Sequence, residues 1–190
     1  MAAGNLRITG GELKGRRLYV PKTGVRPTTG RVREAIFSML GDIGGASVLD
    51  LYCGSGALGI EALSRGAQEA TFVDKRIGAV KRNLEELGIF DGKWGWAMKR
   101  EDVHDFLEAQ GLLGPDIRFD LVFCDPPYRL ASGSVTGLDL FIPGVLAKAG
   151  AAVVLETSSR NPLEFSFPMT NERAYGDTLI RIYSQRGLPR

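Results

Sequence analysis

The chain contains few of the residues on which several classes of function depend. Its 190 residues include one histidine and two cysteines. Cys53 and Cys124 each end an apolar run and are far apart, without the close spacing of metal ligands. The sequence therefore predicts no metal site and two reduced thiols, as is usual in a cytoplasmic protein.

Long apolar segments and linkers are missing as well. No apolar run approaches the about 20 residues that span a bilayer, and the first residues, MAAGNLRITGG, lack the apolar block of a signal peptide. There are no internal repeats and no low-complexity linker. We therefore expect a cytoplasmic, membrane-free protein of a length that fits one domain.

Acidic residues are scarce at one end of the chain. Residues 1–33 hold eight of the 24 basic residues and one of the 22 acidic residues, so this arm carries +7 and the remainder −5. A basic arm on a mildly acidic body indicates a polyanionic partner, most simply a nucleic acid. The alternative is a solvated N-terminal extension.

From residue 47 onward, apolar strand patterns alternate with helical ones. Strands are expected at 47–52, 69–74, 93–98, 119–124 and 151–157. Helices are expected at 57–66, 76–88, 103–111 and 135–148, where Pro143 and Gly144 could break the last one. This alternation is typical of an α/β fold, with a mostly parallel sheet covered by helices on both faces.

The two ends of the chain depart from this alternation. At the tail, residues 163–167 and 178–185 predict an antiparallel hairpin that completes a seven-stranded, Rossmann-like sheet. At the head, RITGG and RRLYV predict a small β-hairpin, followed by a helix in 27–40 capped by Thr28 or Thr29. We expect residues 1–42 to form an extension of a domain at 43–190. The helix should dock through its apolar positions and leave its basic ones outside: Val32, Ala35, Ile36 and Met39 inside, Arg31 and Arg33 outside.

A glycine-rich loop follows the first strand of the alternation. Gly54, Gly56 and Gly59 in CGSGALG have GxGxxG spacing between a strand and a helix, which is the context that a nucleotide-type ligand requires. Asp74 ends the next strand, where an acid would receive ribose hydroxyls. Asp50, which ends the first strand, would repel a dinucleotide pyrophosphate and attract the ammonium group of S-adenosylmethionine (SAM). Asp50 could instead be a buried structural acid that caps the loop.

The strand at 119–124 ends in Asp125, Pro126, Pro127 and Tyr128. Two prolines cannot continue the ladder, so the loop should be rigid and should place its carboxylate beside the glycine loop. Hydrogen-bond acceptors above an aromatic ring suit a planar base with an exocyclic amino group. The alternative is a turn that merely ends a strand.

Two further polar residues follow the third strand. Asp102 could accept the adenine amino group of SAM, or could cap the helix that begins near Val103. His104, the only histidine, has no partner in the pattern and is interpreted as a surface residue rather than a base.

Together, RITGGELKGRRL, VRPTT with RVREAIF, VLDLYCGSGALGIEALSRGA and VFCDPPY closely resemble the bacterial 16S ribosomal RNA guanine-N(2) methyltransferase D family. The similarity weakens after about Glu156. Gly30 replaces an acid found in many relatives, which leaves open how that helix start is fixed, and Cys53 and Cys124 replace alanine. The resemblance implies a class I SAM-dependent methyltransferase that modifies one guanine amino group in 16S rRNA. It also implies action on an assembled or late-assembling small subunit. Separately, we expect the protein to be a monomer.

The resemblance also implies a set of site residues. The catalytic residues are Asp125, Pro126, Pro127 and Tyr128. The cofactor residues are Asp50, Leu51, Tyr52, Cys53, Gly54, Ser55, Gly56, Asp74, Lys75, Arg76, Asp102 and Val103. The basic arm and the VRPTT segment, rather than the resemblance, predict most of the RNA-binding residues, and the full predicted set is Arg7, Lys14, Arg16, Arg17, Arg26, Pro27, Thr28, Thr29, Arg31, Arg33 and Arg129. No metal is implied.

Three other functions remain open at this point. An adenine methyltransferase of DNA or RNA could use the same DPPY loop, although a DNA enzyme would usually carry a larger target-recognition insertion. A dinucleotide-dependent oxidoreductase is disfavoured by Asp50 and by the lack of a proton-transfer residue. The third alternative is a non-catalytic RNA-binding module.

Overall fold

The computed structural model describes residues 6–21, 28–89, 92–113, 118–127, 132–147 and 150–184. Four of the predicted site residues, Arg26, Pro27, Tyr128 and Arg129, lie outside these ranges. In the described residues, no helix is both long enough and apolar enough to cross a membrane.

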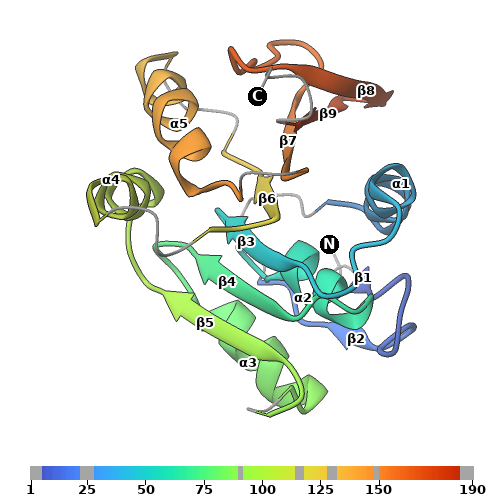
Figure 1. The fold of residues 1–190 in the computed structure, drawn as a ribbon. Coiled ribbons are helices and arrows are strands. Elements are labelled where there is room, and N and C mark those ends of the chain that lie inside the picture. Colours follow the sequence, from blue (N-terminus) through green and yellow to red (C-terminus); the bar gives the residue numbers. More distant parts are fainter. Residues whose placement is uncertain are drawn as a thin grey trace.

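A seven-stranded sheet forms the centre of the molecule (Figure 1). Its order is β5-β4-β3-β6-β7-β9-β8; β3 pairs in parallel with both β4 and β6, and β9 is antiparallel to β7 and β8. The sequence prediction of a mostly parallel sheet closed by an antiparallel hairpin is therefore confirmed. The strands are β3 (Ser47–Leu51), β4 (Glu69–Val73), β5 (Gly95–Lys99), β6 (Leu121–Cys124), β7 (Ala152–Ser158), β8 (Met169–Tyr175) and β9 (Thr178–Ser184).

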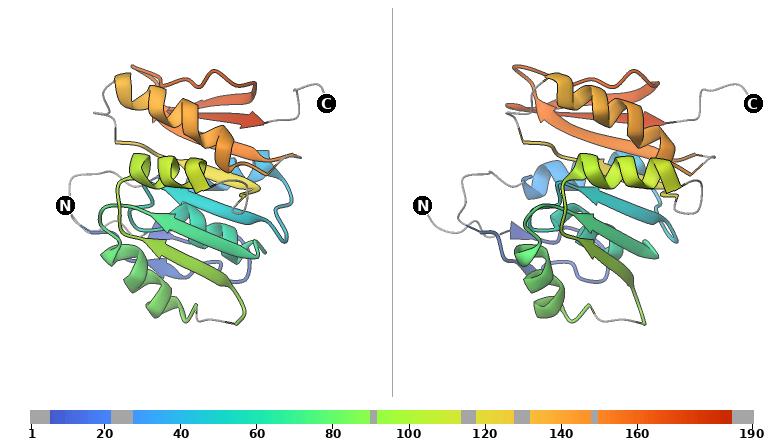
Figure 2. Two further views of the ribbon diagram at one scale, coloured as in Figure 1. Left: turned by 60° about the vertical axis from the view of Figure 1, so that its left-hand side comes forward. Right: turned by 90° about the vertical axis from the view of Figure 1, so that its left-hand side faces the viewer.

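Five helices cover the two faces of this sheet, because its strands are apolar on both sides. They are α1 (Gly30–Leu40), α2 (Ala57–Ser64), α3 (Gly78–Leu87), α4 (Val103–Leu113) and α5 (Ser132–Val145). Helices α4 and α5 lie together on one face (Figure 2), and α1, α2 and α3 pack on the other. The predicted break at Pro143 does not occur, since α5 continues to Val145.

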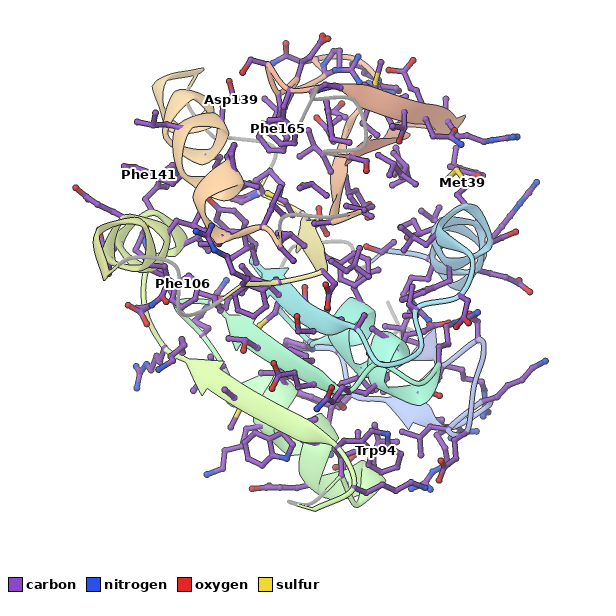
Figure 3. The ribbon with its side chains drawn as sticks, in the orientation of Figure 1. Met39, Trp94, Phe106, Asp139, Phe141 and Phe165 are labelled. Atoms are coloured by element: carbon purple, nitrogen blue, oxygen red, sulfur yellow. The ribbon has the colours of Figure 1, made fainter. Side chains whose placement is uncertain are left out.

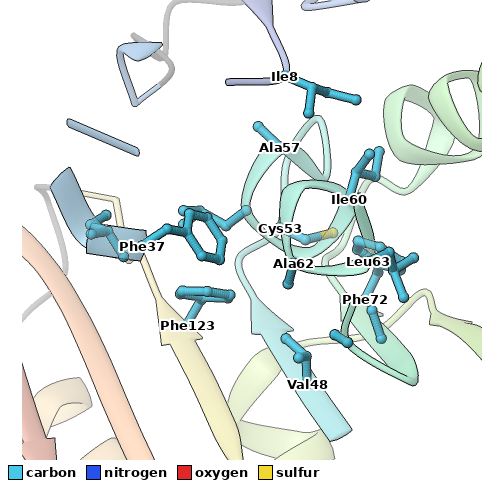
Figure 4. Packing of buried hydrophobic residues seen from close by; sticks show 14 of the residues in the cluster. Ile8, Phe37, Val48, Cys53, Ala57, Ile60, Ala62, Leu63, Phe72 and Phe123 are labelled. Carbon is cyan, nitrogen blue, oxygen red and sulfur yellow. The ribbon is translucent and has the colours of Figure 1, made fainter. Parts of the chain in front are cut away.

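The N-terminal extension shares the core of the sheet rather than standing apart from it. Strands β1 (Leu6–Arg7) and β2 (Arg17–Leu18) form the predicted antiparallel hairpin, whose buried leucines belong to the same cluster as α2 and α3. On α1, the ring of Phe37 meets that of Phe123 on β6 edge to face, with centroids 5.7 Å apart (Figure 4). The extension is therefore held against the strand that carries the DPPY loop.

The predicted strand at 163–167 is wrong. These residues form a loop whose aromatic side chains fill the space beside α5: Phe165 and Phe167 stack on one another and both contact Tyr183 of β9. Figure 3 shows Phe165 between α5 and the C-terminal strands. The apolar residues of LEFSF alternate because they pack against Tyr183 from a loop, not because they form a strand. The strand that pairs with β9 is β8, whose residues are mostly exposed.

Helix α1 begins as predicted, but one of its basic residues points inward. Thr29 is the N-cap, and its hydroxyl accepts a hydrogen bond from the amide of Val32. Arg33 is 0% exposed and forms a buried ion pair with Glu61 of α2, with Nε 2.9 Å from Oε2. The prediction that Arg33 lies outside is therefore wrong. The sequence pattern placed Arg33 on the basic, exposed side of α1, but the ion pair with Glu61 of another helix allows the arginine to be buried.

Candidate active site

The glycine loop joins β3 to α2 at the carboxyl edge of the sheet. Gly54 and Gly56 both have positive φ, 54° and 75°. A Cβ atom on Gly54 would be 3.9 Å from the nearest atom outside its neighbours, whereas one on Gly56 would be 2.4 Å from Cγ2 of Val80. Gly54 therefore leaves open surface that a ligand could approach, and Gly56 is required by the close packing of the loop against α3.

Asp50 lies beneath this loop. It is 3% exposed, and its Oδ2 accepts a hydrogen bond from the amide of Gly59 at 2.9 Å. The carboxylate therefore caps the loop, which confirms the second of its two predicted roles, and its part in binding the cofactor stays a prediction. Burial raises the pKa of Asp50 to about 7; the bond from Gly59 opposes this rise and the charge of Asp74 adds to it.

Asp74 and Asp102 follow β4 and β5 at the same edge. Asp74 accepts hydrogen bonds from the amides of Gly54, at 3.0 Å, and Arg76, at 2.8 Å. Asp102 accepts from the amide of His104 at 2.8 Å, which confirms it as a cap of α4. Its other oxygen lies 2.6 Å from Nζ of Lys75, and this contact holds the pKa of Asp102 below its usual range. The predicted cofactor acids thus surround the loop.

Two polar groups on the α4 side of the site lack a hydrogen-bond partner among the described residues. Tyr52 has φ of 57°, an uncommon value for a residue with a side chain, and its buried hydroxyl is unpaired. His104 is half-buried with an unpaired Nε2, and its ring lies against Gly137 of α5. The interpretation of His104 as a surface residue is therefore wrong, because α5 packs against α4 at this point.

The DPPY loop begins directly beyond β6, next to the glycine loop. Since Leu51 pairs with Cys124, β3 and β6 end side by side at the point where the strand order reverses. Asp125 is half-buried, Pro126 is buried and Pro127 is exposed. The position of the predicted catalytic carboxylate beside the predicted cofactor loop follows from this pairing.

A further acid, Glu156 of β7, lies beside Asp125 and was not predicted. Glu156 is 5% exposed and accepts a hydrogen bond from the Thr28 hydroxyl at 2.7 Å. Burial raises the pKa of Asp125 well above its usual range, the charges of Glu156 and Asp50 raise it further, and the Thr28 hydroxyl opposes the rise. A signal existed in the sequence, because Glu156 interrupts the apolar run AAVVLET as Asp50 interrupts SVLDLY.

The segment between β2 and α1 starts and ends at this edge. Asn83 of α3 binds both the backbone of Tyr19 and the carbonyl of Ser55 in the glycine loop, at 2.9 and 2.8 Å. At the other end, Thr28 binds Glu156. The described basic residues that remain exposed on the extension are Arg7, Lys14, Arg16, Arg17 and Arg31.

Several known proteins that resemble this chain over most of its length are named as ribosomal RNA methyltransferases. It is 36% identical to a putative rRNA methyltransferase of Bacillus subtilis, over 96% of this chain and 100% of that protein. It is 34% identical to the ribosomal RNA small subunit methyltransferase D of Escherichia coli, over 96% of this chain and 91% of that protein. The structure of a putative methyltransferase from Escherichia coli has a TM-score of 0.75 and 33% identity, covering 95% of this chain and 98% of the other.

The family resemblance expected from the motifs is thereby confirmed. A family described as conserved hypothetical protein 95 matches residues 6–184. This range includes every strand of the sheet, the glycine loop and the DPPY loop. The chain therefore belongs to this family, the family of the ribosomal RNA small subunit methyltransferase D.

Proposed function

We propose that this chain transfers a methyl group from SAM to the exocyclic amino group of one guanine in the RNA of the bacterial small ribosomal subunit. The observation that carries the proposal is the position of Asp125, held directly beside the glycine loop where β3 and β6 end together. The names of the relatives support ribosomal RNA as the substrate class. Since that substrate belongs to the ribosome, we expect the protein to act in the cytoplasm.

The residues around the loop fit SAM better than a dinucleotide. Gly54 offers uncovered backbone, and Asp74 fixes the loop while remaining partly exposed for ribose hydroxyls. Among the described residues Asp50 has no cationic partner, so its charge would attract a cationic ligand and repel a pyrophosphate. The unpaired hydroxyl of Tyr52 could bind a further polar group of the ligand. When bound, SAM supplies an electrophilic methyl group on a sulfonium.

The residues of this chain would then act on the acceptor base. An exocyclic amine is a poor nucleophile because its lone pair is delocalised into the ring. The carboxylate of Asp125 can accept hydrogen bonds from the amino hydrogens and favour the tetrahedral nitrogen that forms during attack. Pro126 and Pro127 restrict the backbone angles of the loop that carries Asp125. The carboxylate therefore needs little reorientation when the base binds.

The exposed basic residues of the extension support docking on RNA. Arg17 on β2 and Arg31 on α1 flank the segment from Tyr19 to Thr28, and Arg16 directly precedes β2. Both ends of this segment reach the edge of the site. Phosphate contacts by such residues would orient the protein without reading sequence. We propose that the substrate is an assembled or late-assembling subunit and that the protein acts as a monomer.

The direct test is methyl transfer to small subunits that lack the modification, with the methylated nucleoside identified by mass spectrometry. We expect N(2)-methylguanosine from the wild-type protein. Asp125→Ala should lower turnover by about 10²–10³-fold with the fold and SAM affinity nearly intact, because one preorganised polar contact is lost. Asp125→Asn keeps an acceptor oxygen and should retain more activity.

Asp120→Asn provides a matched control. Asp120 is exposed at the opposite edge of the same sheet, where its carboxylate accepts hydrogen bonds from Ser47, and an amide oxygen can replace that acceptor. This variant should methylate at the wild-type rate. Methyladenosine as the product, or near-normal turnover of a folded Asp125→Ala protein, would contradict the proposed function of the DPPY loop.

A further inference from the structure

Asp125 directly follows strand β6, and Glu156 lies on the neighbouring parallel strand β7. The two strands pair with Phe123 opposite Val154 and Cys124 opposite Leu155, and Asp125 and Glu156 are the residues that follow this last pair. Neighbouring strands lie about 4.8 Å apart, and residues two positions apart point to the same face. Since Val154 belongs to the core under α1, the side chain of Glu156 is directed to that face, where it meets Thr28. The charge of Glu156 reaches Asp125 at the end of β6.

A hydroxyl group from the extension holds this pair of acids. Thr28, which is buried, donates to Oε2 of Glu156 at 2.7 Å. Thr28 is itself fixed, because its carbonyl accepts a hydrogen bond from Nη1 of Arg33 at 2.8 Å. The guanidinium of Arg33 is in turn anchored by Glu61. The orientation of Glu156 therefore depends on a chain of buried contacts that starts at Glu61 in α2 and ends on β7, beside the start of the DPPY loop.

We propose that Glu156 is a positioning residue for methyl transfer: fixed by Thr28, its carboxylate shares one proton with that of Asp125 and thereby sets the orientation and the charge of the catalytic acid. This inference rests on the function proposed above. Desolvation raises the pKa of both carboxyls, and the charge of Glu156 raises that of Asp125 further, so the pair holds a proton above the ordinary range of these acids. Asp125 binds amino hydrogens best when the proton resides on Glu156 or has left the pair.

The charged groups that face the pair in the described structure have opposing effects. Asp50 on β3 disfavours ionisation of Asp125, and Arg33 on α1 favours ionisation of Glu156. The Thr28 hydroxyl favours the charged form of both acids. Removing the charge of Glu156 and removing the hydroxyl of Thr28 should therefore change the protonation of Asp125 in opposite directions.

The test is the pH dependence of methyl transfer in matched variants. Glu156→Gln keeps an oxygen for Thr28 but removes the negative charge that raises the pKa of Asp125, so the acid limb of the turnover profile should move to lower pH. Thr28→Val keeps the shape and removes the hydroxyl, so the limb should move to higher pH. Thr28→Ser keeps the hydroxyl and should leave the acid limb of the turnover profile at its wild-type pH. A purely structural role would lower turnover equally at every pH, and that result would overturn the proposal.

A second measurement separates this inference from the proposed function. Carbon-13 NMR of the side-chain carboxyls can follow the titration of Asp125 and Glu156 in the free wild-type protein, with Glu156→Gln used for assignment. We expect at least one carboxyl of the pair to titrate well above the ordinary range of these acids. Titration of both in the ordinary acid range would overturn the shared proton, whether or not the protein methylates RNA. Absence of methyl transfer by the wild type would refute the proposed function alone.

Discussion

Replacing Asp50 with asparagine should make the folded protein more stable at alkaline pH and its cofactor binding weaker. The carboxyl group is almost completely buried, and its pKa rises from 3.8 to about 7 on folding. The folded state therefore holds a proton that the unfolded chain has lost. The stability that this group contributes is complete below about pH 4 and is lost as the pH rises through about 7.

The size of the effect follows from the pKa difference. A rise of about three units, at about 1.36 kcal/mol each, is a loss of about 4 kcal/mol above neutral pH. Asparagine keeps an oxygen for the amide of Gly59 and cannot ionise. Urea unfolding at about pH 4 and about pH 8 should show little difference between variant and wild type at the lower pH, and a more stable variant, by up to about 4 kcal/mol, at the higher one.

Cofactor binding gives the second half of the measurement. Calorimetry should show that wild type binds SAM and releases part of a proton near neutral pH, because a cationic ligand favours the ionised form of Asp50. Asp50→Asn should bind at least about tenfold more weakly and release no proton. Asp120→Asn on the exposed edge serves as the control for both assays. A stability difference independent of pH would refute the assignment of a buried, protonated acid, and tight NAD binding without SAM binding would refute the methyltransferase site.

Two further predictions concern the basic residues. Arg33→Met should lower the free energy of unfolding by about 1–3 kcal/mol in chemical denaturation, because Oε2 of Glu61 loses its buried donor while Arg65 still binds Oε1. Arg31→Met, at an exposed position, should stay within about 0.5 kcal/mol. Equal stability of these two variants would contradict the structural role of Arg33. Neutralising Arg16 and Arg17 should weaken binding to the ribosomal subunit and flatten its salt dependence while leaving SAM affinity unchanged. If the dependence of binding on salt concentration stayed unchanged, Arg16 and Arg17 would not contact phosphates of the RNA.

The acids that the sequence could not assign differ in what surrounds them. Asp50 and Asp102 were each given two roles, and the structure shows the capping role in both cases through their bonds to the amides of Gly59 and His104. A single sequence shows that an acid ends a strand but not which amide its carboxylate meets. Glu156 was missed for a related reason, since its importance comes from lying beside Asp125 rather than from any motif.

Local pattern determined much of this protein. The alternation of apolar strands with helices indicated the parallel sheet, and the glycine loop and DPPY placed two groups of site residues at its carboxyl edge, because period and turn chemistry depend only on neighbouring residues. The tertiary structure alone decided what distant segments do to one another. It turned Arg33 inward to Glu61, packed residues 163–167 against Tyr183 instead of pairing them as a strand, and brought Thr28 to the end of β7. These outcomes depend on burial and charge pairing between elements far apart in the chain, which no local pattern records.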